Sequence, residues 1–294
     1  MPNSPVAAGG WEAVGPDRFR LAEGARWSGG RLVFVDLLAG DLYRHRTAAR
    51  HAERVERLQR LGVPLGAVAP VAGRPGWWIA AAGTGFALVG PGAGPPDWLA
   101  RPEEAAGTPM RMNDGACDPA GRFWAGSMAA DGSPGAGSLH RLDPDGSVHR
   151  VLHGLGVPNG PAFSADGTAM YLADSAARTI HRFPLDPGSG ALGRPHPMVR
   201  FAAGEGRPDG MAVDDAGLLW VAVWGAAEVR AYSAAGALVR TVAVPTPHVS
   251  SVAFGGGRMW VTTARHRLRR PDATAGAVLG SPTAVTAPPA RPYG

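Results

Sequence analysis

Gly121-Arg122-Phe123-Trp124 joins a turn glycine to an aromatic strand, and this phrase decides the fold because the chain repeats it. Related phrases begin at five further glycines, which are Gly30, Gly76, Gly167, Gly217 and Gly257. Consecutive turn glycines lie 46, 45, 46, 50 and 40 residues apart. A period near 45 with strand–turn–strand content is typical of a propeller blade. The sequence therefore predicts an all-β, six-bladed β-propeller that occupies residues 1–294 as a single domain.

Composition supports a turn-rich β structure. The chain has 43 Gly, 28 Pro and nine Trp among its 294 residues, and 45% of its residues are hydrophobic, which is enough for a sizeable core. Residues 47–61 place apolar side chains at helical intervals, but the 46-residue spacing leaves no room for an extra element, so we expect outer strands there. The tail, residues 281–294, reads as irregular coil, and we expect the last blade to close with strands from both chain ends.

The charge and the chain's N-terminal sequence argue against several classes of partner. The net charge is +5, and all 29 basic residues are Arg. They are mostly dispersed, and the one dense run, residues 265–270, reads as a solvated loop, so no nucleic-acid partner is expected. One cysteine excludes an intrachain disulfide, no signal peptide is visible, and the longest apolar run is too short for a membrane span. We expect a cytoplasmic monomer or weak oligomer without a membrane partner.

Four polar residues occupy matched places in their repeats. One of them precedes its turn glycine by seven residues and the other three by eight, and the set is Glu23, Asn113, Asn159 and Asp209. We expect each to lie just before an inner strand, so that the rotational repeat brings all four to one mouth of the central channel. Asn-Gly and Asp-Gly pairs are also common turns, but turns at surface loops need not keep register with the repeat.

These side chains present carboxylate and amide oxygens. Hard oxygen donors favour Ca²⁺, Mg²⁺ or Mn²⁺, and Zn²⁺ is a further candidate because it also binds carboxylates. Blades two and six have Leu65-Gly66 and Ser250-Ser251 at this place. The ring of ligands is therefore incomplete, which leaves coordination positions for water or substrate, as a catalytic metal requires.

Several longer motifs resemble the SMP-30/gluconolactonase/LRE family, which includes regucalcin and bacterial sugar lactonases. The resemblance covers essentially the whole chain and rests on motifs in a fixed order. The strongest are Arg111-Met112-Asn113-Asp114-Gly115, Asp118-Pro119-Ala120-Gly121-Arg122-Phe123-Trp124 and Pro208-Asp209-Gly210-Met211, supported by Glu23-Gly24, Asn159-Gly160 and Trp260-Val261-Thr262-Thr263.

The resemblance implies one divalent metal ion in the channel, with Ca²⁺ as the first choice. Glu23, Asn159 and Asp209 match the family's metal ligands, and Asp209 also matches the proposed general base. Arg111 and Asn113 match its substrate-binding pair, and Asp131 lies where some members hold a sugar hydroxyl.

The resulting hypothesis is a metal-dependent, gluconolactonase-like lactonase that hydrolyses a sugar lactone to the aldonic acid. The metal would polarise the lactone carbonyl, and Asp209 would take a proton from the attacking water. The alternatives are another lactone or an organophosphate ester as substrate, or a non-enzymatic calcium-binding or interaction propeller. For Arg111 the alternative is an ion pair with Asp131 or Glu104.

Other side chains are given structural roles. His266 reads as a solvated loop residue, Cys117 as a small buried hydrophobe, and Trp224 as the tryptophan that lines the pocket. The tryptophans on predicted strands are assigned to the core.

Overall fold

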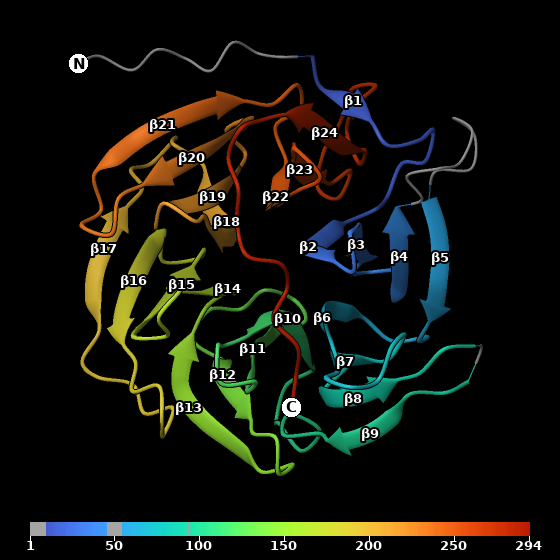
Figure 1. Cartoon of the computed structure of the whole chain (residues 1–294), viewed down its shortest axis with the longest axis vertical. Helices are drawn as coiled ribbons and strands as arrows, with labels where there is room; N and C mark the ends of the chain where they lie inside the picture. The colour runs from blue at the N-terminus through green and yellow to red at the C-terminus, as the bar shows by residue number, and fades with distance from the viewer. Residues whose placement is uncertain (1–9, 46–54, 93) are drawn as a thin grey trace.

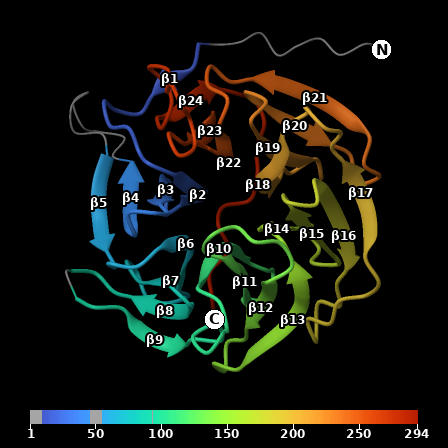
Figure 2. The ribbon, with the colours of Figure 1, turned by 180° about the vertical axis from the view of Figure 1, so that it is seen from behind.

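The computed structural model describes residues 10–45, 55–92 and 94–294, and in these residues 24 strands form six antiparallel sheets of four strands each. The sheets stand around a common centre like the blades of a propeller, with the strand that precedes each turn glycine innermost (Figures 1 and 2). The predicted all-β six-bladed propeller is thereby confirmed. In the described ranges, no helix has the length and apolar character needed to cross a membrane.

The strands follow the repeat from the first inner strand onward. Blade one consists of β2 (Ala22–Ser28), β3 (Arg31–Asp36), β4 (Asp41–His45) and β5 (Val55–Arg60). Blade two consists of β6 (Leu65–Pro70), β7 (Trp78–Ala82), β8 (Gly85–Val89) and β9 (Asp97–Ala100). Blade three consists of β10 (Met110–Cys117), β11 (Phe123–Ala129), β12 (Gly137–Leu142) and β13 (Val148–Leu155).

The second half of the ring repeats this arrangement. Blade four consists of β14 (Pro158–Phe163), β15 (Ala169–Asp174), β16 (Thr179–Pro184) and β17 (His196–Arg200). Blade five consists of β18 (Arg207–Val213), β19 (Leu219–Trp224), β20 (Glu228–Tyr232) and β21 (Leu238–Ala243). Blade six consists of β22 (Val249–Gly255), β23 (Arg258–Thr263), β24 (Val278–Pro282) and β1 (Glu12–Ala13).

The turn glycines explain why the repeat is legible in the sequence. All six have positive φ, between 71° and 80°. This region of backbone conformation is open to glycine but costly for residues with a Cβ atom. Each glycine therefore fixes the turn between the first two strands of its blade.

The ring closes with both ends of the chain. Strand β1 pairs antiparallel with β24, with Glu12 opposite Gly280. This arrangement confirms the predicted closure. The expected outer strand in blade one is confirmed at β5, while residues 47–54 of that prediction lie outside the described residues.

Buried tryptophans anchor the turns of blades three and five. Trp124 and Trp220 are fully enclosed, and each donates its indole N–H to the aspartate that opens the turn, Asp118 at 2.9 Å and Asp214 at 2.8 Å. These bonds satisfy the polar end of a large core side chain. The assignment of these tryptophans to the core is confirmed.

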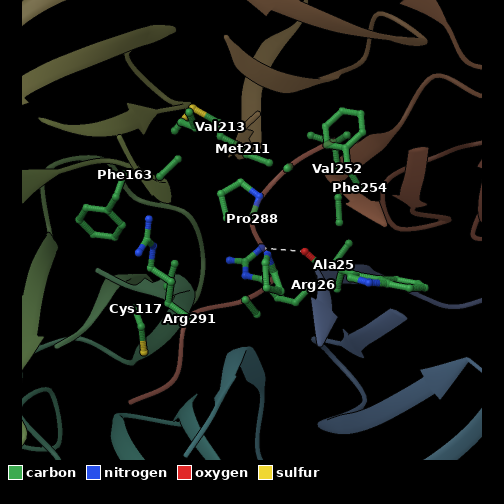
Figure 3. Close-up of a pocket in the computed structure, with 18 of the residues that line it drawn as sticks. Ala25, Arg26, Cys117, Phe163, Met211, Val213, Val252, Phe254, Pro288 and Arg291 are labelled. Atoms are coloured by element: carbon green, nitrogen blue, oxygen red, sulfur yellow. Dashed lines mark hydrogen bonds between the residues drawn. The ribbon is translucent and has the colours of Figure 1, made fainter. Parts of the chain in front are cut away.

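From residue 283 the C-terminal tail crosses one end of the channel as irregular coil, as predicted (Figure 1). Ser281 and Pro282, which the sequence also assigned to coil, instead end strand β24 because they pair with β23. Together with the later halves of the inner strands the tail lines a cavity of about 110 Å³. Figure 3 shows Pro288 and Arg291 of the tail facing Phe163, Met211 and Phe254 across this cavity. The chain's own terminus therefore lies across this end of the channel.

Tyr293 fastens the tail to blades two and three. Its ring packs in the core cluster of these blades, and its hydroxyl donates to the carbonyl of Asp143 at 2.8 Å. We expect Tyr293→Phe to lower the free energy of unfolding by about 1 kcal/mol, the net worth of a typical hydrogen bond. Tyr171→Phe is the matched control, because within the described residues the Tyr171 hydroxyl makes no hydrogen bond. Urea denaturation checks both, and equal stability of Tyr293→Phe and wild type would contradict this anchoring.

Candidate functional site

A β-bulge interrupts each inner strand near its start. The pairing with the second strand shifts between Glu23 and Arg26 in β2, and between Asn159 and Ala162 in β14. Equivalent shifts occur in β6, β10, β18 and β22. The prediction that the polar residues precede the inner strands was wrong, because they lie inside the strands. A bulge turns a side chain out of the regular alternation, which aims these groups into the channel.

In blades two and five, the glycine after this position allows the neighbouring blades to meet closely. A Cβ atom on Gly210 would lie 2.7 Å from the Cβ of Ser251 in the next blade, and one on Gly66 would clash with the carbonyl of Asn113. Side chains larger than hydrogen therefore have no room there. Gly66 and Gly210 thus serve the packing around the axis.

The earlier halves of the inner strands line a pocket of about 350 Å³. Five of the six predicted site residues lie in its wall, which are Glu23, Arg111, Asn113, Asn159 and Asp209. All except the half-buried Arg111 are at most 7% exposed. This pocket and the cavity under the tail lie toward opposite ends of the inner strands.

Asp131 is the exception among the predicted residues. It is exposed, and its carboxylate accepts hydrogen bonds from the backbone N–H and hydroxyl of Ser133, both at 2.8 Å. Its neighbour Gly132 lines the pocket, so Asp131 lies at the rim. Its role in substrate binding stays a prediction.

A chain of hydrogen bonds fixes the amide groups of the pocket. Arg111 Nη1 donates to Asn113 Oδ1 at 2.7 Å, and Asn113 Nδ2 donates to Asn159 Oδ1 at 2.8 Å. Asn159 Nδ2 then donates to the hydroxyl of Ser175 at 2.7 Å, and that hydroxyl donates to the carbonyl of Pro208. The chain links blades three, four and five and sets the orientation of each amide.

The same contacts decide the alternative for Arg111. Glu104 pairs with Arg101, and Asp131 bonds to Ser133, so neither forms the ion pair that the sequence left open. Arg111 instead contacts Asn113 and the carbonyl of Met112. Burial, with a contribution from the positive charge of Arg267, lowers the pKa of Arg111 to about 10.

Negative charge is concentrated at the floor of the pocket. Burial and repulsion from Asp209 and Asp114 raise the pKa of Glu23 well above its ordinary value. Burial and repulsion from Asp114 do the same to the pKa of Asp209. Asp114 lies behind them and is held by the backbone N–H of Gly160 and by the guanidinium of Arg26.

Asp209 also carries an unsatisfied acceptor. Its Oδ1 atom is buried and has no hydrogen-bond partner among the described residues. Buried carboxylate oxygens without a partner are rare and costly, and a cation is a common explanation for one.

The donor set fits a hard divalent cation. Glu23 and Asp209 supply two carboxylates, and Asn159 Oδ1, which accepts one hydrogen bond, keeps a second lone pair. Oxygen donors of these types are those that Ca²⁺ and Mg²⁺ prefer. In the described ranges no three His, Cys, Asp or Glu side chains form a metal-binding group, and here the third donor is an amide.

The pocket wall also contains residues that the sequence does not predict to lie there. Arg267 and His266 line the pocket, although their run was read as a solvated loop, and Arg20 and Arg207 complete the mouth. Trp224 lines the pocket as predicted and stacks on His248 with ring centroids 4.0 Å apart. The cationic residues come from loops and strand ends that do not repeat between blades, so no periodic signal marked them.

The sequence and the fold of this chain are similar to those of known proteins. The model of the SMP-30/Gluconolactonase/LRE-like region matches residues 21–265. Pentonolactonase XacC of Haloferax volcanii is 42% identical over 160 residues, which are 53% of this chain and 54% of that protein. The chain thus matches about half the length of that relative.

Two further comparisons extend over nearly the whole chain. Regucalcin of Macaca fascicularis is 31% identical over 285 residues, covering 89% of this chain and 91% of that protein. The crystal structure of a calcium-binding protein, regucalcin, from Agrobacterium tumefaciens superposes with a TM-score of 0.87 at 26% identity and covers 96% of both chains.

Proposed function

This chain belongs to the SMP-30/gluconolactonase/LRE-like family, and from that premise we propose that it is a metal-dependent hydrolase that opens a sugar lactone to the aldonic acid. The observation that carries the proposal is the unpartnered Oδ1 of Asp209 in the same pocket wall as Glu23 and Asn159. The name of the pentonolactonase relative supports a lactone as substrate.

Glu23, Asn159 and Asp209 would hold one divalent ion. The all-oxygen donor set suits Ca²⁺, Mg²⁺ and Mn²⁺, and Zn²⁺ also binds carboxylates. Ca²⁺ is the first choice because the similar regucalcin of Agrobacterium tumefaciens is described as a calcium-binding protein. When bound, the ion supplies Lewis acidity for the lactone carbonyl and neutralises the mutual repulsion of Glu23 and Asp209. The hydrogen bond from Asn113 keeps Asn159 Oδ1 in place for this role.

Asp209 is the proposed general base. It takes a proton from the attacking water as the water oxygen forms a bond to the carbonyl carbon. When the ring C–O bond breaks, the leaving ring oxygen takes that proton, and the product is the open hydroxy acid. The buried position of Asp209 keeps bulk water from competing for the proton.

Arg111 is the proposed partner of the substrate's oxygens. With its pKa near 10 it is charged at neutral pH, and among the described residues its hydrogen bonds, to Asn113 and Met112, come from Nη1 alone. Its remaining N–H groups are donors for the ring hydroxyls and for negative charge that develops on the carbonyl oxygen. Asn113 holds Arg111 in this position, and Asp131 at the rim is proposed to accept from a sugar hydroxyl.

A substrate panel tests the proposal. With Ca²⁺ present, we expect pH-indicator assays to show turnover above the spontaneous rate for at least one of D-glucono-1,5-lactone, L-arabino-1,4-lactone and D-galactono-1,4-lactone. A phosphotriester assayed in parallel should not be hydrolysed. Turnover of the triester alone would move the assignment to organophosphate esters. A folded protein that binds Ca²⁺ and hydrolyses nothing would instead indicate a calcium-binding propeller.

A further inference from the structure

The mouth of the pocket is more cationic than a neutral sugar requires. Four arginines line the pocket, which are Arg20, Arg111, Arg207 and Arg267, and His266 lies beside them. The carboxylates in the same wall are Glu23 and Asp209. A divalent ion held at the floor would neutralise those two carboxylates and leave the positive charge of the arginines uncompensated.

Three of these guanidiniums are without a partner. Within the described residues, the side chains of Arg20, Arg207 and Arg267 make no hydrogen bond and no ion pair, and all three residues are exposed. Other pairs show that the chain does match arginines where structure needs them, such as Arg122 with Asp118 at 2.6 Å and Arg60 with Asp41 at 2.8 Å.

The carboxylates near the mouth of the pocket accept hydrogen bonds from other groups. Asp36 accepts from the backbone N–H groups of Arg20 and Leu21, and Asp174 accepts from those of Gly156 and Val157. Asp131 accepts from Ser133. These aspartates hold turns together and do not face the free guanidiniums as ion-pair partners.

The side chain of Arg267 lies across the mouth of the pocket, and its backbone has an unfavourable conformation. Its φ is +63°, a conformation that is uncommon for residues other than glycine. Its Nη2 would be 3.7 Å from a Cβ built on Gly132, so the side chain spans from blade six to the rim loop of blade three. Its positive charge also repels the positive charge of Arg111. Strained and like-charged residues gathered at a pocket are typical of a binding site for the opposite charge.

Depth separates the two charged parts of the pocket. Glu23, Asn159 and Asp209 are buried at the floor, whereas the three free arginines are exposed at the mouth. A lactone whose carbonyl faces the floor therefore presents its far end to the arginines. Arginine is suited to phosphate and carboxylate because its planar N–H groups bind their oxygens in pairs.

From this arrangement we infer that the preferred substrate is a lactone with an anionic group, phosphate or carboxylate, at the end remote from the ring carbonyl, bound by Arg20, Arg207 and Arg267. The inference rests on the proposed lactonase function and names its substrate class.

Two matched pairs of substrates test the inference on the full-length, Ca²⁺-loaded chain. The phosphate pair is D-glucono-1,5-lactone and its 6-phosphate. The carboxylate pair is D-galactono-1,4-lactone and D-galactaro-1,4-lactone. We expect kcat/KM for at least one anionic member to exceed that of its neutral partner by about 10-fold to 100-fold, the range of a charge-assisted hydrogen bond. That preference should shrink as salt is raised, because exposed charges are screened.

A variant locates the effect. Arg267→Ala should reduce the anionic-to-neutral ratio of kcat/KM by about 10-fold. Arg269→Ala is the matched control, since Arg269 is exposed on the same loop but outside the pocket wall, and it should keep the wild-type ratio. The pair that shows the preference identifies phosphate or carboxylate as the group.

The outcomes separate this inference from the proposed function. Hydrolysis of the neutral lactones at rates equal to or above those of their anionic partners would overturn the inference and leave the lactonase in place. An unchanged ratio in Arg267→Ala would overturn the assignment of the binding group. No hydrolysis of any of the four would overturn the proposed function itself.

Discussion

Asp209→Asn is expected to lower kcat for lactone hydrolysis by about 10²- to 10⁴-fold, the usual contribution of a positioned general base. The amide keeps the shape of the side chain but accepts no proton at neutral pH. It also removes one of the two negative charges proposed to hold the metal, so calorimetry should show weakened Ca²⁺ binding in the same variant.

The stability of the variant distinguishes a functional loss from unfolding. Because burial and repulsion from Asp114 disfavour the charged form of Asp209, the metal-free Asn variant should unfold at the same or a higher temperature than the metal-free wild type. Asp215→Asn is the control, since Asp215 is an exposed carboxylate in the same blade and lies outside the pocket. Its activity should match wild type. Wild-type kcat in Asp209→Asn would remove Asp209 from the mechanism.

The sequence shows the repeat because each blade needs the same glycine turn followed by the same kind of strand. A glycine with positive φ must open the second strand, and an aromatic or β-branched strand must follow it, as at Gly121 and Trp124. The offset of the polar residues from these glycines then placed Glu23, Asn159 and Asp209 in one pocket wall. Periodicity therefore predicted both the fold and the gathering of these side chains.

Features without a period were not predicted. The bulges were missed because they shift hydrogen-bond pairing without changing residue type, so Asn159 and Asp209 were placed before their strands and not within them. The sequence predicts a solvated Arg267, because the direction of its side chain across the mouth depends on one backbone conformation in the loop between β23 and β24. The Arg26–Asp114 pair joins residues 88 positions apart, a separation that only the closed ring brings into contact.

Removal of the metal is the second change with a large expected effect. Without the cation, Glu23 and Asp209 lie in one buried wall, with pKa values raised by burial and by repulsion from neighbouring carboxylates. Protonation of either group would also remove a ligand, and Asp209 could no longer act as a base. We therefore expect chelation to reduce hydrolysis to the spontaneous rate and to lower the unfolding temperature. Ligand binding to the native state alone stabilises it in proportion to RT ln(1 + [L]/Kd).

Chelation followed by stepwise return of metal tests whether hydrolysis depends on one bound divalent ion. The preferred lactone from the panel is assayed with chelated protein, and Ca²⁺, Mg²⁺, Mn²⁺ or Zn²⁺ is added while binding is measured by calorimetry. We predict that turnover vanishes on chelation and returns with one equivalent of bound ion in wild type, and that Glu23→Gln neither binds that ion tightly nor recovers. Undiminished turnover by protein shown by elemental analysis to contain no metal would contradict this prediction.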